Sequence, residues 1–175
     1  MKKIIHNLEE VYVLNDNFVK YLSKIGIKRN PAGRKSNLSI AEYMTLILLK
    51  QELGIRKTNI FYFLVQNIFR RYFSKLPSYQ QFNDGLRHTL PYLLLLTNLI
   101  VNKNKKNKSI FYIVDSTPLP ICANAYRYNL KIDNGLAKTG KKLNGWFYGF
   151  KAHLIVNSNL EIVGLSFSDG SKKRL

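Results

Sequence analysis

The chain has 175 residues, of which 46% are hydrophobic, so it is long enough for one domain of ordinary size or two small ones. It carries 28 Lys and Arg residues against 10 Asp and Glu residues, and this formal charge of +18 favours nucleic acid as a partner over an anionic membrane surface. A composition biased toward lysine and asparagine is a second explanation for part of the charge. The single cysteine excludes an internal disulfide, and no apolar run reaches the roughly 20 residues of a membrane span, so we expect a cytoplasmic protein.

Apolar residues in the first hundred positions recur at steps of three or four, which predicts a helical domain over residues 1–101. The first helix is expected to end at Gly26, where a glycine provides the stop. Ser39 and Glu42 have the spacing of a capping box that opens a second helix. That helix is expected to end at Gly54.

A third helix is predicted over residues 58–73, with Thr58 as its cap. The second and third helices, within residues 39–72, have the order of a helix-turn-helix motif, although most such pairs in small domains only pack against each other. Arg70 and Arg71 at the end of the third helix either contact phosphates or complement the helix dipole.

A fourth helix is expected over residues 78–101, and the lysine-rich polar segment 102–109 then predicts a linker between two domains. After the linker the pattern changes from helical to strand-like. Strands are predicted over residues 110–115, 146–156 and 161–167, the last two forming a β-hairpin.

The carboxylate of Asp115 follows the apolar run 110–114 and precedes a Ser-Thr-Pro turn signal. Because Pro118 cannot continue a central strand, we expect Asp115 at the carboxyl end of a buried strand, where α/β folds tend to place chemistry. A carboxylate there is a natural ligand for Mg²⁺. The alternative is that Asp115 only caps the turn.

The segment 121–145 is predicted to be a long basic loop in which lysines and arginines alternate with tyrosines and glycines. Such a loop suits contact with a phosphate backbone, and an ordinary solvated loop is the alternative. The candidate DNA-binding residues of this loop are Arg127, Lys138, Lys141 and Lys142.

The order of these features resembles the DDE transposases of bacterial insertion sequences. The resemblance rests on three stretches. Together with the N-terminal region, they extend it over nearly the whole chain, up to about Phe167. The stretches are Tyr112-Ile113-Val114-Asp115-Ser116-Thr117-Pro118-Leu119-Pro120, Gly135-Leu136-Ala137-Lys138-Thr139-Gly140-Lys141 and Gly145-Trp146-Phe147-Tyr148-Gly149-Phe150-Lys151-Ala152-His153-Leu154-Ile155.

The resemblance implies a ribonuclease-H-like catalytic domain in which three acidic residues hold two divalent cations, Mg²⁺ or Mn²⁺, for attack on a phosphodiester. It implies that Asp115 is the first of these acidic residues and that Lys138, Lys141 and Lys151 face DNA. His153 is more readily a packed residue than a metal ligand. The implied fold is α+β, a helical N-terminal domain followed, over residues 110–175, by the first three strands of an incomplete ribonuclease-H-like α/β domain.

The resemblance supplies one acidic residue of the three, because Asp169 does not match the family's second position. We therefore expect a truncated transposase with little or no strand-transfer activity, explained either by a decayed gene or by a first reading frame of a frameshifted enzyme. The expected partners are transposon-end DNA and either a second copy of the chain or the full-length transposase, with no membrane. The alternatives are a DNA-binding module or transposition inhibitor without catalysis, and a basic structural or RNA-binding protein.

Overall fold

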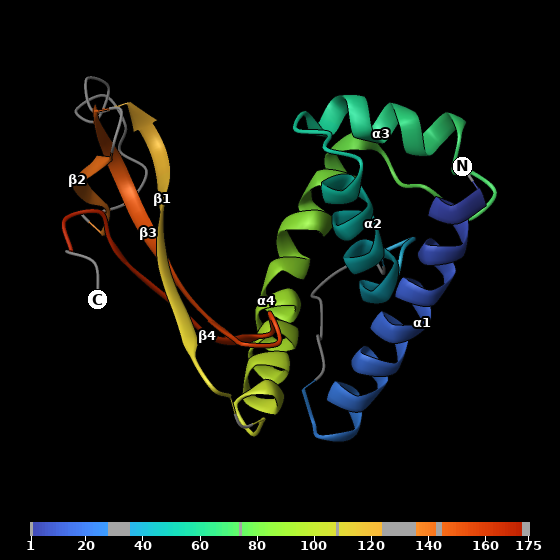
Figure 1. Cartoon of the computed structure of the whole chain (residues 1–175). Helices are drawn as coiled ribbons and strands as arrows, with labels where there is room; N and C mark the ends of the chain where they lie inside the picture. Colours follow the sequence, from blue (N-terminus) through green and yellow to red (C-terminus); the bar gives the residue numbers. More distant parts are fainter. Residues whose placement is uncertain are drawn as a thin grey trace. The chain divides into compact units, whose positions relative to one another are not determined.

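The computed structural model of the chain describes residues 2–27, 36–73, 75–107, 109–123, 136–142 and 145–172. It divides into two units, Met1–Leu96 and Thr97–Leu175, the first helical and the second built on a β-sheet (Figure 1). The fold is therefore α+β, as the sequence predicts. No described helix is both long enough and apolar enough to span a membrane.

The first unit is built from helices. They are α1 (Lys2–Lys24), α2 (Ile40–Glu52), α3 (Thr58–Asn67) and α4 (Tyr79–Asn104), of which α4 continues into the second unit. The predicted capping box at the start of α2 is confirmed, because Ser39 N donates to Glu42 Oε2 at 2.6 Å and Glu42 N donates to Ser39 Oγ at 3.2 Å. The stops predicted at Gly26 and Gly54 are confirmed too, with φ angles of +86° and +65°.

The third helix differs from the prediction at both ends. Its N-cap is Lys57, which makes no side-chain cap, while the Thr58 hydroxyl accepts a hydrogen bond from Lys50 Nζ at 3.1 Å. The helix ends at Asn67, and turns follow it to Phe73. Phe69 and Phe73 are nonetheless buried, so the apolar spacing continues in a segment whose backbone is not helical.

The core of the first unit contains a cluster of aromatic rings around Phe82, which is fully buried on α4. The Phe82 ring centroid lies 6.2 Å from that of Tyr43, 6.3 Å from that of Phe61 and 5.1 Å from that of Tyr62. Such tilted and edge-on ring pairs add to the free energy gained by burying their area. Phe82 thereby joins α4 to α2 and α3.

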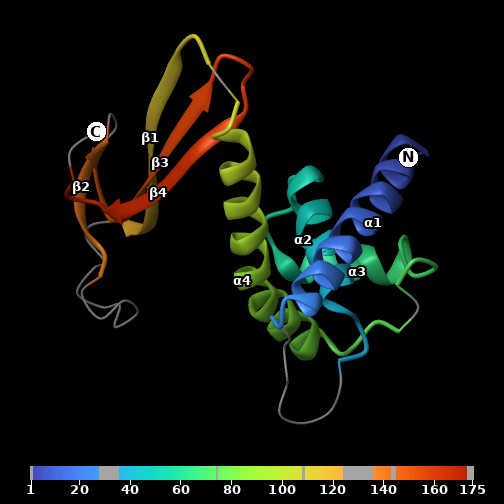
Figure 2. The ribbon, with the colours of Figure 1, turned by 90° about the horizontal axis from the view of Figure 1, so that it is seen from below.

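The second unit contains a four-stranded antiparallel sheet. Its strands are β1 (Tyr112–Ala123), β2 (Lys138–Lys142), β3 (Gly145–Asn157) and β4 (Ile162–Asp169). The central strand is β3, which pairs with β1 along one side and with β2 and then β4 along the other (Figure 2). Among the described residues, β1 is therefore an edge strand.

Two strand predictions are wrong and one is confirmed. The first strand does not end at Asp115 but runs to Ala123, and it accommodates Pro118 because an edge strand can lack a backbone donor. The predicted loop 121–145 contains β2, so the described part of the chain has four strands and not three. The hairpin of the last two strands is confirmed, since β3 and β4 pair from Phe150 onward.

Glycines allow three segments of the sheet to come together backbone to backbone. A Cβ atom on Gly140 would lie 2.1 Å from the Gly170 carbonyl oxygen, and one on Gly149 would lie 2.2 Å from the Leu119 carbonyl oxygen. Gly170 N donates to the Gly149 carbonyl at 2.8 Å, which closes the contact after β4. Only glycine fits at such distances.

Substitution Gly140→Ala is expected to lower the free energy of unfolding by about 1–3 kcal/mol, because the methyl group overlaps a backbone oxygen that cannot move alone. Thermal and denaturant unfolding followed by circular dichroism measures the effect. The control Ser166→Ala, on the exposed part of β4, should stay within about 0.5 kcal/mol of the wild type. Equal stability of Gly140→Ala and the wild type would contradict the close approach.

Candidate functional site

Asp115 lies within β1 and not at the end of a strand, which corrects the predicted position. It is the fourth residue of the strand and is exposed to solvent. Its cross-strand partner is Leu154 on β3, whose partner on β4 is Leu165. The carboxylate therefore projects from an apolar row of the sheet instead of capping a turn.

Asp169, the other acidic residue within the described strands, is too far from Asp115 to share a metal ion with it. Asp169 is in register with Phe150 and Leu119, four residues along the sheet from Asp115 and two strands away. Strand spacings of ~4.8 Å and a rise of ~3.3 Å per residue separate the two Cα atoms by about 16 Å. An Mg²⁺ ion holds its oxygen ligands at about 2.1 Å.

Asp169 instead organises the end of β4. Its Oδ1 accepts hydrogen bonds from the backbone N of Ser171 at 2.9 Å and from the Ser171 hydroxyl. Its Oδ2 lies 3.4 Å from Lys138 Nζ. These hydrogen bonds from Ser171, with the nearby Lys138 charge, lower the pKa of Asp169 below its ordinary value.

The described residues do not form a complete metal site. No group of three or more His, Cys, Asp or Glu side chains comes together anywhere in the described ranges. Asp115 is a single, exposed hard oxygen ligand opposite Leu154, and one carboxylate alone holds Mg²⁺ weakly. The residues present here thus do not by themselves fit the pair of cations that the resemblance implies.

A row of polar side chains crosses the opposite face of the sheet, beside Asp115. His153 on β3 is only 4% exposed, and its cross-strand partner on β1 is Ser116. The ring Nε2 of His153 lies 2.7 Å from the hydroxyl of Ser168 on β4. Both His153 Nδ1 and Ser116 Oγ are buried without a hydrogen-bond partner among the described residues.

His153 is thus packed, as the sequence suggests, and its contact with Ser168 joins β3 to β4. The sequence identified neither serine as its neighbour, since their proximity depends on strand register.

The basic residues proposed for DNA contact differ in how they are held. Lys138 pairs with Asp169, and Lys151 Nζ donates to the carbonyl of Lys172. Lys141 and Lys142 are exposed at the end of β2, opposite Trp146 and Gly145 of β3. Arg127 lies outside the described residues.

An exposed tryptophan accompanies the lysines of β2. Trp146 is 60% exposed and is the cross-strand partner of Lys141. Basic side chains next to an exposed aromatic ring form a surface that suits nucleic acid, through charge and through stacking. The position of Trp146 opposite Lys141 follows from the pairing of β2, a strand within the predicted loop 121–145.

Arg70 and Arg71 lie in the turns after α3 and not at the end of a helix. The guanidinium carbon of Arg71 is 4.9 Å from the ring centroid of Tyr72, a cation–π contact. Both arginines are exposed. The prediction that Arg70 and Arg71 lie in the last turn of a helix and complement its dipole is therefore wrong about their position.

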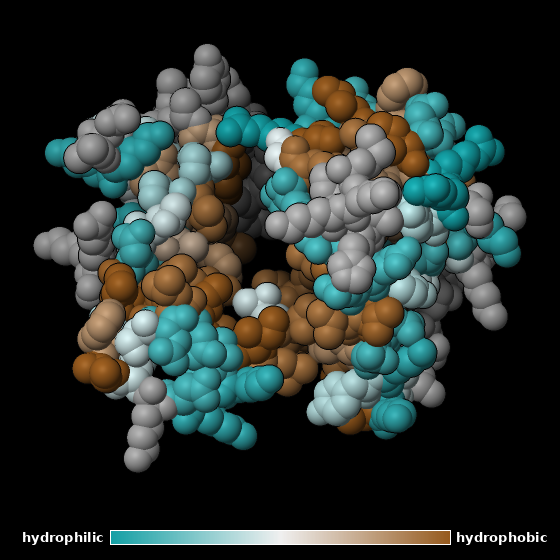
Figure 3. Space-filling view, turned by 45° about the vertical axis from the view of Figure 1, so that its right-hand side comes forward, coloured by the Kyte–Doolittle hydropathy of each residue, from teal (hydrophilic) through white to brown (hydrophobic). Residues whose placement is uncertain are grey.

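Hydrophobic residues also gather in patches on the surface (Figure 3). In the sheet, the exposed residues include Phe167 on β4 and several residues of β1, namely Tyr112, Ile113, Val114 and Leu119. Patches of this kind mark surfaces that contact other molecules more often than isolated exposed residues do.

Comparison with protein families matches residues 104–174 to the transposase DDE domain. The match contains Asp115, the row of Ser116, His153 and Ser168, and the whole sheet. Residues 104–174 are therefore similar to a transposase DDE domain. Searches of curated proteins and of solved structures found no match.

The DDE domain match links residues 104–174 to transposition. The matched residues begin at the end of α4, so the helices of the first unit lie outside the match. Their role rests on their own structure and charge.

The two serines around His153 should respond differently to substitution. Ser168→Ala removes the only described hydrogen-bond partner of a buried ring nitrogen and should cost about 1–3 kcal/mol of stability. Ser116→Ala removes a buried hydroxyl that makes no described hydrogen bond, so stability should be unchanged or slightly higher. Denaturant titration of both variants tests this, and a larger loss for Ser116→Ala than for Ser168→Ala would refute the assignment.

Proposed function

We propose that this chain is the DNA-binding portion of an insertion-sequence transposase, with Asp115 as the first acidic residue of its catalytic site. The single observation that carries the proposal is an exposed carboxylate on β1 within the matched DDE domain. In the complete enzyme, Asp115 would help to hold a divalent metal, which would supply Lewis-acid chemistry at a phosphodiester.

The arrangement of strands supports a ribonuclease-H-like domain. A long strand bearing the acidic residue pairs antiparallel with β3, which forms a hairpin with β4. The outer side of β1 pairs with no described strand. An additional strand that supplies a second carboxylate would have a free edge to join at this position.

We propose that the described residues alone do not transfer strands, because they provide one carboxylate to a reaction that uses two metal ions. The remaining ligands would come from outside the described residues. What this chain contributes by itself is a fixed position for Asp115 and a basic surface for DNA.

The proposed DNA surface of the second unit comprises the end of β2 and the start of β3. Lys141, Lys142 and Trp146 are exposed there, whereas Lys138 and Lys151 already have protein partners. Each lysine that contacts a phosphate releases counterions, so its contribution is visible in the salt dependence of binding.

The double substitution Lys141→Ala and Lys142→Ala should weaken binding to duplex DNA and reduce the slope of log affinity against log salt by about 2, since each phosphate contact contributes roughly 0.9. Fluorescence anisotropy at several salt concentrations measures the slope. The charge-preserving pair Lys141→Arg and Lys142→Arg should retain it. An unchanged slope in the alanine variant would remove the end of β2 from the DNA interface.

The role of Asp115 can be tested without catalysis. Mn²⁺ added to the labelled protein should broaden the NMR signals of residues around Asp115, and Asp115→Asn should abolish that local broadening while the fold is retained. Asp169→Asn, at the far end of β4, serves as the matched control and should leave the broadening around Asp115 in place. The same broadening in wild type and Asp115→Asn would exclude Asp115 as a metal ligand.

A second candidate function is favoured by the exposed Lys141, Lys142 and Trp146, because a basic and aromatic surface can bind DNA without a metal. In this alternative the chain binds transposon ends, or forms mixed oligomers with a full-length transposase, without catalysis. It predicts DNA binding with the salt dependence given above but no Mn²⁺ site at Asp115. The NMR experiment therefore separates the two functions.

A further inference from the structure

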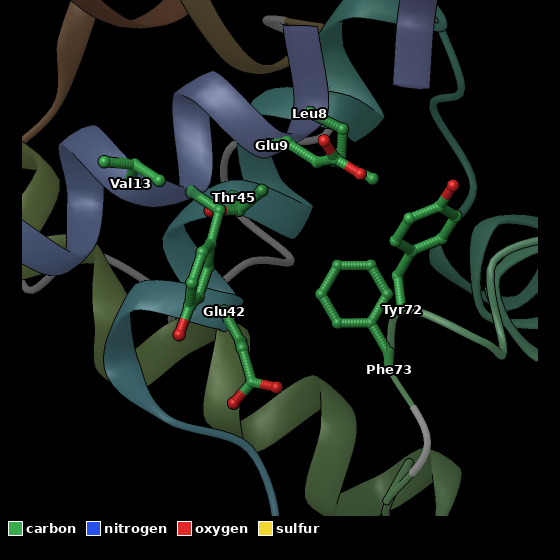
Figure 4. Close-up of a pocket in the computed structure, with 8 residues that line it drawn as sticks. Leu8, Glu9, Val13, Glu42, Thr45, Tyr72 and Phe73 are labelled. Atoms are coloured by element: carbon green, nitrogen blue, oxygen red, sulfur yellow. The ribbon is translucent and has the colours of Figure 1, made fainter. Parts of the chain in front are cut away.

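A pocket of about 410 Å³ lies between α1, the start of α2 and the segment after α3 (Figure 4). Its volume is within the range of about 300–1,000 Å³ typical of ligand sites. Its apolar walls include Leu8, Val13 and Phe73. All of its lining residues belong to the helical unit, which is outside the DDE domain match.

The pocket is negatively charged although the chain is strongly basic. Its only charged lining residues are Glu9 and Glu42, whose carboxylates lie on opposite sides of the space beside Phe73 (Figure 4). Tyr12 also lines the pocket, and its pKa is raised, first by burial and then by the negative charges of Asp16 and Glu42. A cation entering the pocket would therefore meet a favourable potential.

The remaining lining residues indicate an organic cation and not a metal ion. Aromatic rings of Tyr12, Tyr72 and Phe73 border the space, and a metal ion would gain no ligands from them. Aromatic faces do attract ammonium and guanidinium groups. Tyr72 already has one such contact, with the guanidinium of Arg71, which is not among the lining residues.

The site is larger than one ligand side chain requires. A second hollow of about 460 Å³ shares Glu9 and Val13 with the pocket and continues along α1 to Glu10 and Leu14. Leu14 is 69% exposed. An extended peptide with basic and apolar side chains fits this combination better than a small ion does.

We propose that this acidic pocket and the adjoining hollow bind a lysine- or arginine-bearing segment of a second copy of the chain. The chain has 28 basic residues and only 10 acidic ones, of which Glu9 and Glu42 line the pocket and Glu10 lines the adjoining hollow. Asp16 lies outside the lining and pairs with Lys20 at 2.6 Å. A second copy therefore supplies the complementary charge in abundance. In the proposed complex, the basic side chains of the second copy bind at this pocket of the helical unit.

The net charge of +18 does not prevent this association at ordinary salt. The screening length is about 8 Å at physiological ionic strength, so charges on distant parts of the two copies hardly interact. Contacts inside the pocket are partly buried and are screened less. Local complementarity therefore outweighs the overall repulsion, and this balance shifts toward repulsion as the salt concentration is lowered.

Sedimentation velocity of the full chain over a range of concentrations tests the proposal. The wild type should self-associate at physiological salt, and Glu9→Lys should weaken the association constant by about tenfold or more, because it places a like charge against the incoming cation. Glu52→Lys makes the same charge change at the exposed end of α2 and is the matched control. It should leave the association within about twofold of the wild type.

A second measurement makes the assignment specific to the pocket. Triarginine peptide should shift the NMR signals of Tyr12 and Tyr72 and dissociate the wild-type oligomer, and neither effect should occur with Glu9→Lys. A monomeric wild type, or equal association of the Glu9→Lys and Glu52→Lys variants, would overturn the proposal. These results do not depend on DNA or metal binding, so they leave the proposed function untouched.

Discussion

Pairing to β3 is the constraint on which the described sheet depends. Strands β1, β2 and β4 all take their register from β3, which is the one described strand that pairs with each of them. Its two faces consequently organise different chemistry. One face packs His153 against serines of the neighbouring strands, and the other places Leu154 opposite the exposed carboxylate of Asp115. The glycine at position 149 is part of the same constraint, since it admits the backbones of β1 and of the segment after β4.

Features that depend on neighbouring residues in the chain were predictable from the sequence. The capping box of Ser39 and Glu42 is a local exchange of hydrogen bonds within four residues, and the helix ends at Gly26 and Gly54 follow from the backbone freedom of glycine. The β3–β4 hairpin was predictable for a similar reason. Asn157, at the predicted turn, accepts hydrogen bonds from Asn159 and Glu161 with its own side chain.

Features that depend on pairing between distant residues were not predictable. The Ser-Thr-Pro turn signal after Asp115 is overridden because the segment gains a ladder of hydrogen bonds with β3. Strand β2 has a polar sequence with a glycine, and only its pairing with residues 145–149 makes it a strand. The contact of His153 with Ser168, the position of Trp146 beside Lys141 and the charged pocket at Glu9 and Glu42 likewise arise from the tertiary structure.

The two prolines of β1 have a consequence for how the protein behaves at high concentration. Pro118 and Pro120 provide no backbone donor, so the second half of this strand is a poor template for an incoming strand from another molecule. The first half, around Tyr112, Ile113 and Val114, is more than half exposed and contains no proline. Aggregation by edge-to-edge pairing would therefore begin in this first half, and the prolines act as gatekeepers that stop it from spreading along the strand.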